Sequence, residues 1–130
     1  MHPLAPPLTL PNGVAVPLSP AIQTGGLVFV SGQLGFCADG SGLVAGGIRE
    51  QTGAALDNIE RLLNEADLSL ENIVKITGWL TRPEDFSEFN AVYAERFGAV
   101  PPARSMVVSQ LLIPGALVEL EAIAEVESFT

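Results

Sequence analysis

The order of apolar patterns along the chain predicts an α+β fold, with two helices packed on one face of a mixed six-stranded sheet. Two segments with apolar residues at helical spacing, Ile48–Ala66 and a second ending near Phe97, alternate with short apolar runs typical of strands. With 130 residues, 48% of them hydrophobic, the chain can form one domain, residues 1–130, with a substantial core. The face of the sheet opposite the helices would stay uncovered, so we expect a partner subunit there.

The N-terminal part of the chain is predicted to be extended or irregular. Residues 1–20 hold six of the ten prolines, which disfavour a helix. We expect an irregular segment over residues 1–13, a short edge strand at Val14–Pro17 and a second extended piece at Ser19–Gln23. The apolar, partly β-branched run Leu27–Val30 predicts a buried strand.

Small residues follow this strand. Ser31 and Gly32 would let another group approach the backbone closely, although a bulge or a simple strand exit is an alternative. The glycine-rich stretch Phe36–Gly47 lacks both the Lys-Ser/Thr end of a P-loop and GxGxxG spacing, which favours a turn-rich loop over a phosphate site. Cys37 lies in this loop, as a bystander or as a reactive thiol.

The helices and the strand between them have clear signals. Ile48–Ala66 carries a single apolar stripe, and Ile73–Leu80 is a strand-like run. Thr81, followed by a proline in the first turn and a glutamate three residues on, predicts the start of the second helix. Asn90 lies on the apolar stripe of that helix, where a buried amide must find partners. It either pins a neighbouring segment or contacts a ligand.

The C-terminal stretch contains the most informative charged residues. Two strand-like runs, Ser105–Ile113 and Leu117–Glu127, flank Pro114–Gly115 and predict a hairpin. Arg104 stands at the head of the first run, and both Arg104 and Glu119 could reach one cleft. A guanidinium among apolar residues must pair or await an anion, because an unpartnered desolvated charge is costly. The alternatives are a structural Arg–Glu pair and a carboxylate-binding arginine.

Composition excludes several classes of function. Six basic against fifteen acidic residues give a net charge of −9, and the basic residues are scattered, which argues against nucleic-acid binding. One cysteine, Cys37, and one histidine, His2, exclude an intramolecular disulfide and disfavour a metal site or a histidine-dependent triad. No long apolar run or secretory signal is present, so we expect a soluble cytoplasmic protein without membrane contact.

Seven short motifs, in a fixed order, resemble a known family. They are PLSPAI (Pro17–Ile22), FVSGQ (Phe29–Gln33), EQT (Glu50–Thr52), IVKITGWLT (Ile73–Thr81), FSEFNAVYAERF (Phe86–Phe97), PPARS (Pro101–Ser105) and GALVELEAIA (Gly115–Ala124). In combination they make the chain similar, over residues 17–125, to the Rid/YjgF family of reactive-intermediate deaminases, formerly called L-PSP endoribonucleases.

The resemblance implies a chorismate-mutase-like α+β subunit and a homotrimer with a pocket in each cleft between neighbouring subunits. It also implies hydrolysis of imines and enamines, such as 2-iminopropanoate, to 2-oxo acids and ammonia, with neither a metal nor an organic cofactor. Arg104 would hold the substrate carboxylate. Glu119 would position the attacking water with help from a backbone carbonyl near Met106. The other implied pocket positions are Ser31, Gly32 and Asn90, the last in a supporting role.

Two positions depart from the family pattern and bear on the substrate. Ala21 follows Pro20 where many relatives have a tyrosine, and Met106 stands where many have cysteine or threonine. The first change removes a ring and a hydroxyl from the expected pocket wall. A larger or more apolar imine, or a catabolic enamine such as an aminomuconate, is therefore an alternative to 2-iminopropanoate.

Two other functions are compatible with the family. One is a trimeric protein that binds 2-oxo acids or other carboxylates through Arg104 with little turnover, and the other is the endoribonuclease of the older family label. The acidic charge disfavours the endoribonuclease. Fold alone does not decide between them, because function depends on the site.

Overall fold

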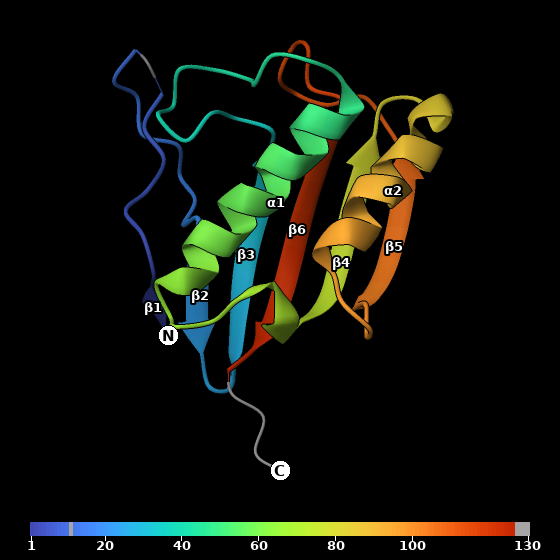
Figure 1. The fold of residues 1–130 in the computed structure, drawn as a ribbon. Helices are drawn as coiled ribbons and strands as arrows, with labels where there is room; N and C mark the ends of the chain where they lie inside the picture. The colour runs from blue at the N-terminus through green and yellow to red at the C-terminus, as the bar shows by residue number, and fades with distance from the viewer. Residues whose placement is uncertain (11, 127–130) are drawn as a thin grey trace.

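The computed structural model describes residues 1–10 and 12–126, in which two helices cover one face of a six-stranded sheet (Figure 1). The helices are α1 (Ile48–Asn64) and α2 (Phe86–Arg96), with short 3-10 turns η1 (Leu70–Asn72) and η2 (Pro83–Asp85). The strands are β1 (His2–Pro3), β2 (Ala21–Thr24), β3 (Leu27–Leu34), β4 (Ile73–Leu80), β5 (Ala103–Val108) and β6 (Val118–Glu125). The predicted α+β fold is confirmed.

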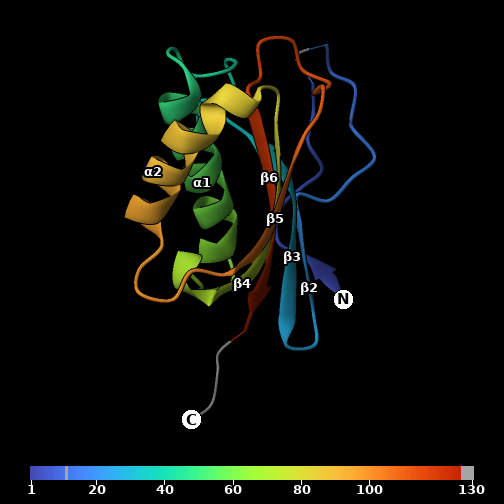
Figure 2. The same ribbon diagram turned by 90° about the vertical axis from the view of Figure 1, so that its right-hand side faces the viewer.

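The sheet has the order β1-β2-β3-β6-β4-β5. β4 and β5 are parallel and the other neighbours are antiparallel, so the sheet is mixed as predicted. Both helices lie on the same side of it, as the edge-on view shows (Figure 2). The predicted helix Ile48–Ala66 ends two residues earlier, and the predicted strand Ile73–Leu80 has the observed bounds.

The core lies between the helices and the sheet. Alternate residues of β6 are buried on the helix side, while Glu119 and Glu121 point to the other side. The apolar stripe of α1 supplies Leu56, Ile59 and Leu63, all fully buried. In the described part of the chain, no helix combines the length and apolar character needed to cross a membrane.

The N-terminal edge of the sheet differs from the prediction. His2–Pro3, within the segment expected to be irregular, pairs with β2 as strand β1. Val14–Pro17, expected to be an edge strand, only forms an isolated bridge between Ala15 and Thr9. The chain turns back at Gly13, whose φ of +85° suits glycine, so this segment folds on itself. Pro11 lies outside the described residues.

The predicted C-terminal hairpin is wrong. β5 and β6 both pair with β4, which lies between them, and β5 runs parallel to β4. The Gln51 side chain of α1 donates to the Gly115 carbonyl at 3.0 Å and accepts from the Leu117 backbone N–H at 2.8 Å. The connection is thus docked on α1 instead of forming a tight turn. The expected end of the last strand, Glu127, lies outside the described residues.

The start of the second helix is also different from the prediction. Thr81 does not cap it, because η2 intervenes after Arg82. Nε and Nη2 of Arg82 donate to the two carboxylate oxygens of the buried Asp85 at 3.1 and 2.7 Å. This bidentate pair orients the turn that leads into α2.

Candidate functional site

Arg104 projects from the edge strand β5 toward α2. It lies opposite Ile76 of β4, whose side chain is buried on the helix side of the sheet. Its Nη1 donates a hydrogen bond of 2.9 Å to Oδ1 of Asn90 in α2. Three aromatic rings of the same helix surround the guanidinium, with ring centroids 5.7, 5.5 and 4.7 Å from Cζ in Phe86, Phe89 and Tyr93. The positive charge is therefore held by one amide and by aromatic faces.

No carboxylate neutralises this charge within the described residues. The four ion pairs there involve Arg49, Arg82 and Arg96, and none involves Arg104. The interpretation of Arg104 as one half of a structural Arg–Glu pair is therefore wrong for Glu119. A guanidinium has five N–H donors, so the single bond to Asn90 leaves donors for an anion.

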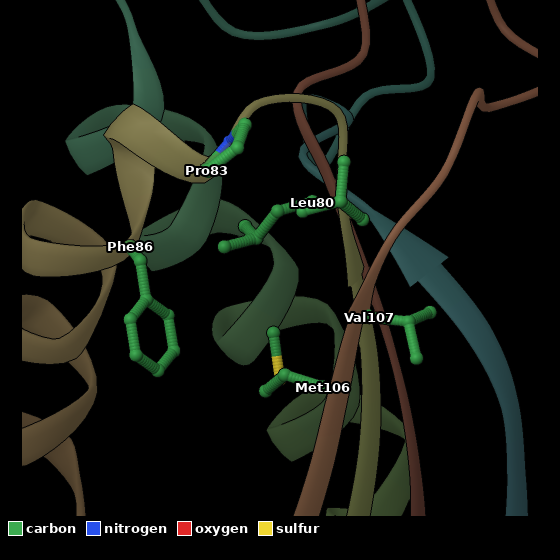
Figure 3. A pocket seen from close by; sticks show the side chains of 6 residues that line it. Leu80, Pro83, Phe86, Met106 and Val107 are labelled. Atoms are coloured by element: carbon green, nitrogen blue, oxygen red, sulfur yellow. The ribbon is translucent and has the colours of Figure 1, made fainter.

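Two cavities flank the Arg104 region, both between α2 and β5. The larger, of about 550 Å³, is lined by the polar side chains of Asn90 and Arg104 and by the ring of Tyr93, together with Ala94, Phe97, Gly98, Pro101 and Pro102. The smaller, of about 240 Å³, is lined by apolar residues and lies beside Met106 (Figure 3). A carboxylate can thus meet the guanidinium in the polar cavity while apolar groups occupy the other.

The ring of Tyr93 packs against the guanidinium of Arg104, and the phenol is neutral. The side chain is only 6% exposed, and its hydroxyl finds no hydrogen-bond partner among the described residues. Burial raises the pKa of Tyr93 to about 12, despite the opposing influence of the nearby Arg104 charge. The phenol therefore stays protonated at neutral pH and does not neutralise the guanidinium.

Glu119 lies on the other face of the sheet, opposite Trp79 of β4. Burial raises the pKa of its carboxyl group, and the nearby Glu121 carboxylate raises it further. The carboxyl lies directly over Gly32 of β3: a Cβ at position 32 would overlap Oε2 and come within 3.0 Å of Cδ. The predicted close approach at Gly32 is confirmed, and the approaching group is Glu119.

The neighbouring Ser31 shapes the same end of β3. The pairing of β3 with β6 shifts register between Val30 and Gln33, so a β-bulge forms at Ser31 and Gly32. The Ser31 hydroxyl donates to the Ser19 carbonyl at 2.7 Å and so ties the bulge to the segment before β2. The bulge places Ser31 and Gly32 next to Glu119.

The predicted site residues thus form two groups on opposite faces of one sheet. Arg104, Asn90 and Met106 lie on the helix face, and Met106 packs against Gly78 of β4. Glu119 and the Ser31–Gly32 bulge form the second group. The expectation that Arg104 and Glu119 reach one cleft is wrong within a single chain, because side chains alternate between the faces of a strand and the sheet separates them.

Ala21 and Cys37 lie away from both groups. Ala21, expected in the pocket wall, is fully buried in the core and has no surface to offer a ligand in the single chain. Cys37 is half-buried in the loop after β3 and forms no disulfide. The described residues include no group of three or more His, Cys, Asp or Glu side chains that could hold a metal ion.

Several residues around Arg104 were not recognised from sequence as parts of the site. Aromatic residues at helical spacing are typical of a core, and Phe89 and Tyr93 are buried there, but Phe86 is 42% exposed and lines the apolar cavity. The spacing of Phe86, Phe89 and Tyr93 along one helix face was the available signal. Gly78, which makes room for Met106, had no such signal.

Comparison with known proteins identifies the family. The family model described as Endoribonuclease L-PSP matches residues 11–126. The chain belongs to this family, the Rid/YjgF family. Among its relatives, the 2-iminobutanoate/2-iminopropanoate deaminase of Bos taurus is 39% identical over 108 residues, which are 83% of this chain and 79% of that protein.

Solved structures of the Rid/YjgF family share the fold. Yeast Mmf1 superimposes with a TM-score of 0.85 at 35% identity, covering 97% of this chain and 98% of Mmf1. Escherichia coli TdcF, whose structure contains bound serine, superimposes with a TM-score of 0.78 at 31% identity. The match covers 86% of this chain and 90% of the TdcF chain. Among family members, then, one is named for imine deamination and another binds an amino acid.

Proposed function

We propose that this protein is an imine/enamine deaminase that hydrolyses 2-imino acids to 2-oxo acids and ammonia. The observation that carries the proposal is Arg104, a half-buried guanidinium bonded to Asn90 and set among aromatic rings, with no carboxylate partner in the described part of the chain. A 2-imino acid brings the missing carboxylate. The kinship with the bovine deaminase supports the reaction type.

Arg104 would hold the substrate by its carboxylate. A guanidinium presents two parallel N–H donors to a carboxylate, which fixes orientation as well as position. With Nη1 engaged by Asn90, we assign Nε and Nη2 to the substrate. This bidentate contact would orient the imine carbon, which is adjacent to the carboxylate, toward an attacking water.

Glu119 would act on that water. In the proposed reaction, Glu119 takes a proton from water as the water oxygen attacks the carbon of the protonated imine, whose C=N electron pair moves to nitrogen, forming a neutral carbinolamine. Glu119 then gives this proton to the carbinolamine nitrogen. The C–N bond breaks, its electron pair leaves with ammonia, and Glu119 takes the hydroxyl proton as the C=O bond of the 2-oxo acid forms; that proton passes on to the released ammonia. A positioned general acid–base contributes about 10²–10⁴-fold to such a rate. The raised pKa of Glu119 brings it closer to neutral pH, where proton transfer in both directions is more effective.

These roles require two subunits, and we propose a homotrimer with sites between neighbours. Since Arg104 and Glu119 lie on opposite faces of one sheet, a site containing both takes one residue from each of two chains. The face that carries Glu119 also exposes apolar side chains, with Phe29 41% and Val107 53% exposed. Burying this face between chains would remove apolar surface from water. Ultracentrifugation should give three times the chain mass of 13.6 kDa.

Subunit mixing tests the shared site directly. Arg104→Ala and Glu119→Gln are each expected to be inactive. When the two variants are unfolded together and refolded, random assembly pairs an intact Arg104 with an intact Glu119 at about one quarter of the sites. Activity should return to about that fraction of wild type. Mixed protein without activity would show that the two residues do not act across an interface.

The activity itself is tested with imines generated in situ by amino-acid oxidases, starting with 2-iminopropanoate. Ammonia and 2-oxo acid release would be compared with the spontaneous rate. Arg104→Ala should lose the acceleration, whereas Arg49→Ala, which removes the same charge from a surface ion pair with Glu95, should keep it. If no imine is accelerated while wild type still binds 2-oxo acids through Arg104, the protein is a carboxylate-binding protein instead.

The proposal includes a cytoplasmic location. Fractionation with an antibody against the chain would test this location.

A further inference from the structure

The apolar cavity beside Met106 has a lining that suits a hydrocarbon group. Its volume is about 240 Å³, and it lies between the turn leading into α2 and the strand β5 (Figure 3). The lining residues are Leu80, Pro83, Phe86, Met106, Val107 and Val108, of which Val107 directs its side chain away from Phe86 and Met106, toward the other face of the sheet. None of these side chains is charged or polar, so a charged group placed there would lose its hydration without gaining a partner.

This cavity adjoins the guanidinium of Arg104. Met106 is two residues further along β5 and, because side chains alternate along a strand, points to the same helix face. Phe86 links the two regions, since its ring lies 5.7 Å from Cζ of Arg104 and also lines the cavity. Phe86 thus stands between the guanidinium and the cavity, and a molecule whose carboxylate is held by Arg104 would reach the cavity by extending its side chain past this ring.

Met106 forms an adjustable wall of the cavity. Its side chain extends from β5 toward Phe86 (Figure 3) and packs over Gly78 of β4. A Cβ at position 78 would come within 2.5 Å of Sδ of Met106 and 2.7 Å of Cδ2 of Leu120. The glycine thus gives the thioether its place on the sheet, and methionine, being unbranched, can adapt to the group that enters.

We propose that this cavity is the side-chain subsite of the enzyme, and that it selects 2-imino acids with apolar side chains of four or more heavy atoms over small or charged ones. The inference rests on the proposed deaminase function. A space of 240 Å³ corresponds to the volume of about eight water molecules at ~30 Å³ each, enough for a branched aliphatic or thioether side chain. Met106 is the specificity-determining residue of the subsite.

The test compares kcat/KM for imines generated from alanine, leucine, methionine, phenylalanine and glutamate. Each buried methylene in an apolar pocket favours a substrate about tenfold or more. We expect the leucine- and methionine-derived imines to exceed the alanine-derived one by at least about tenfold, and the glutamate-derived one to fall on the order of a hundredfold below leucine.

Two variants change the size of the subsite in opposite directions. Met106→Ala should shift the preference toward the phenylalanine-derived imine. Gly78→Ala should push the thioether into the cavity and shift the preference toward the alanine-derived imine. Leu112→Ala, an aliphatic truncation at a side chain 97% exposed, controls for loss of apolar atoms elsewhere and should leave the ranking unchanged.

The outcomes separate this inference from the deaminase proposal. Hydrolysis of all imines at similar kcat/KM, or a ranking unaffected by Met106→Ala, would overturn the subsite while keeping the activity. Isothermal calorimetry on the matching 2-oxo acids gives their dissociation constants, which should follow the same ranking and require no turnover. If the 2-oxo acids bind in this order but no imine is hydrolysed, the subsite is retained and the deaminase proposal is rejected. Equal binding of all the 2-oxo acids would overturn the subsite whether or not the protein turns over.

Discussion

Oδ1 of Asn90 accepts a hydrogen bond of 2.9 Å from Nη1 of Arg104, which fixes the guanidinium between the helix α2 and the strand β5. The amide is neutral, so it orients the arginine without consuming its charge. An amide oxygen at this point therefore suits an arginine that is reserved for an anionic ligand.

Replacing this amide with a carboxylate should impair substrate binding. Asn90→Asp keeps the shape but adds a negative charge beside Arg104, which would compete with the substrate carboxylate. We expect KM for imines to rise on the order of tenfold, since a hydrogen bond to a charged group is worth about 1.5–3 kcal/mol and the substrate carboxylate would have to compete with it. Asn64→Asp, the same change at an exposed position at the end of α1, should leave KM unchanged. Steady-state kinetics on both variants gives the comparison, and an unchanged KM in Asn90→Asp would contradict the role of Arg104.

A methyl group at position 32 should displace the carboxyl of Glu119. A Cβ there would overlap Oε2, so Gly32→Ala forces the carboxyl away from its site. We expect kcat to fall about 10²-fold or more, as for loss of general acid–base assistance, with a small change in KM. Gly26→Ala is the matched control, because nothing lies within 4 Å of a Cβ at that position. Circular dichroism should show that both variants fold, and equal kcat values would argue against Glu119 as the base.

The pH dependence of hydrolysis should report on Glu119. As a base, Glu119 must be ionised in the free enzyme, so kcat/KM should rise with pH through its pKa. Burial and Glu121 both raise that pKa, which moves the rise above the usual glutamate range of about 4.3. Glu121→Gln removes one of the two causes and should move the rise to lower pH. A rise that stays in place in Glu121→Gln, or that persists in Glu119→Gln, would assign it to another group.

Removing the hydroxyl of Tyr93 should stabilise the protein. The hydroxyl is buried without a partner in the described residues, and an unsatisfied buried polar group costs about 1–3 kcal/mol. Tyr93→Phe keeps the ring against Arg104, so the free energy of unfolding in urea should rise by about 1 kcal/mol while KM stays the same. Tyr93→Leu, which removes the aromatic face, should instead raise KM. A less stable Tyr93→Phe variant would mean that the hydroxyl does have a partner.

Much of this architecture could be predicted from local patterns. The stripe of Ile48–Ala66 and the run Ile73–Leu80 predict their elements because helix and strand periodicity are local properties of the chain. Arg104 attracts notice for a local reason as well, since it is a charged residue at the head of an apolar run, whereas Glu119 is one of several acidic residues that alternate with apolar ones and is singled out by the family resemblance. The small side chain at Gly32 allows a close approach or a bulge, and the structure has both at this position.

The partners of these residues depend on contacts between distant segments. Pro114–Gly115 resembles a hairpin turn, but Gln51 docks that turn on α1, and β4 enters between β5 and β6 with both of its edges paired. No local pattern specifies such an insertion, because strand order results from which buried faces pack best together. The same insertion places Arg104 against α2 and Glu119 on the opposite face of the sheet. The residue types were therefore evident in the chain itself, whereas the separation of the two charges, and the need for a second subunit that we infer from it, emerge only once the strands are ordered in space.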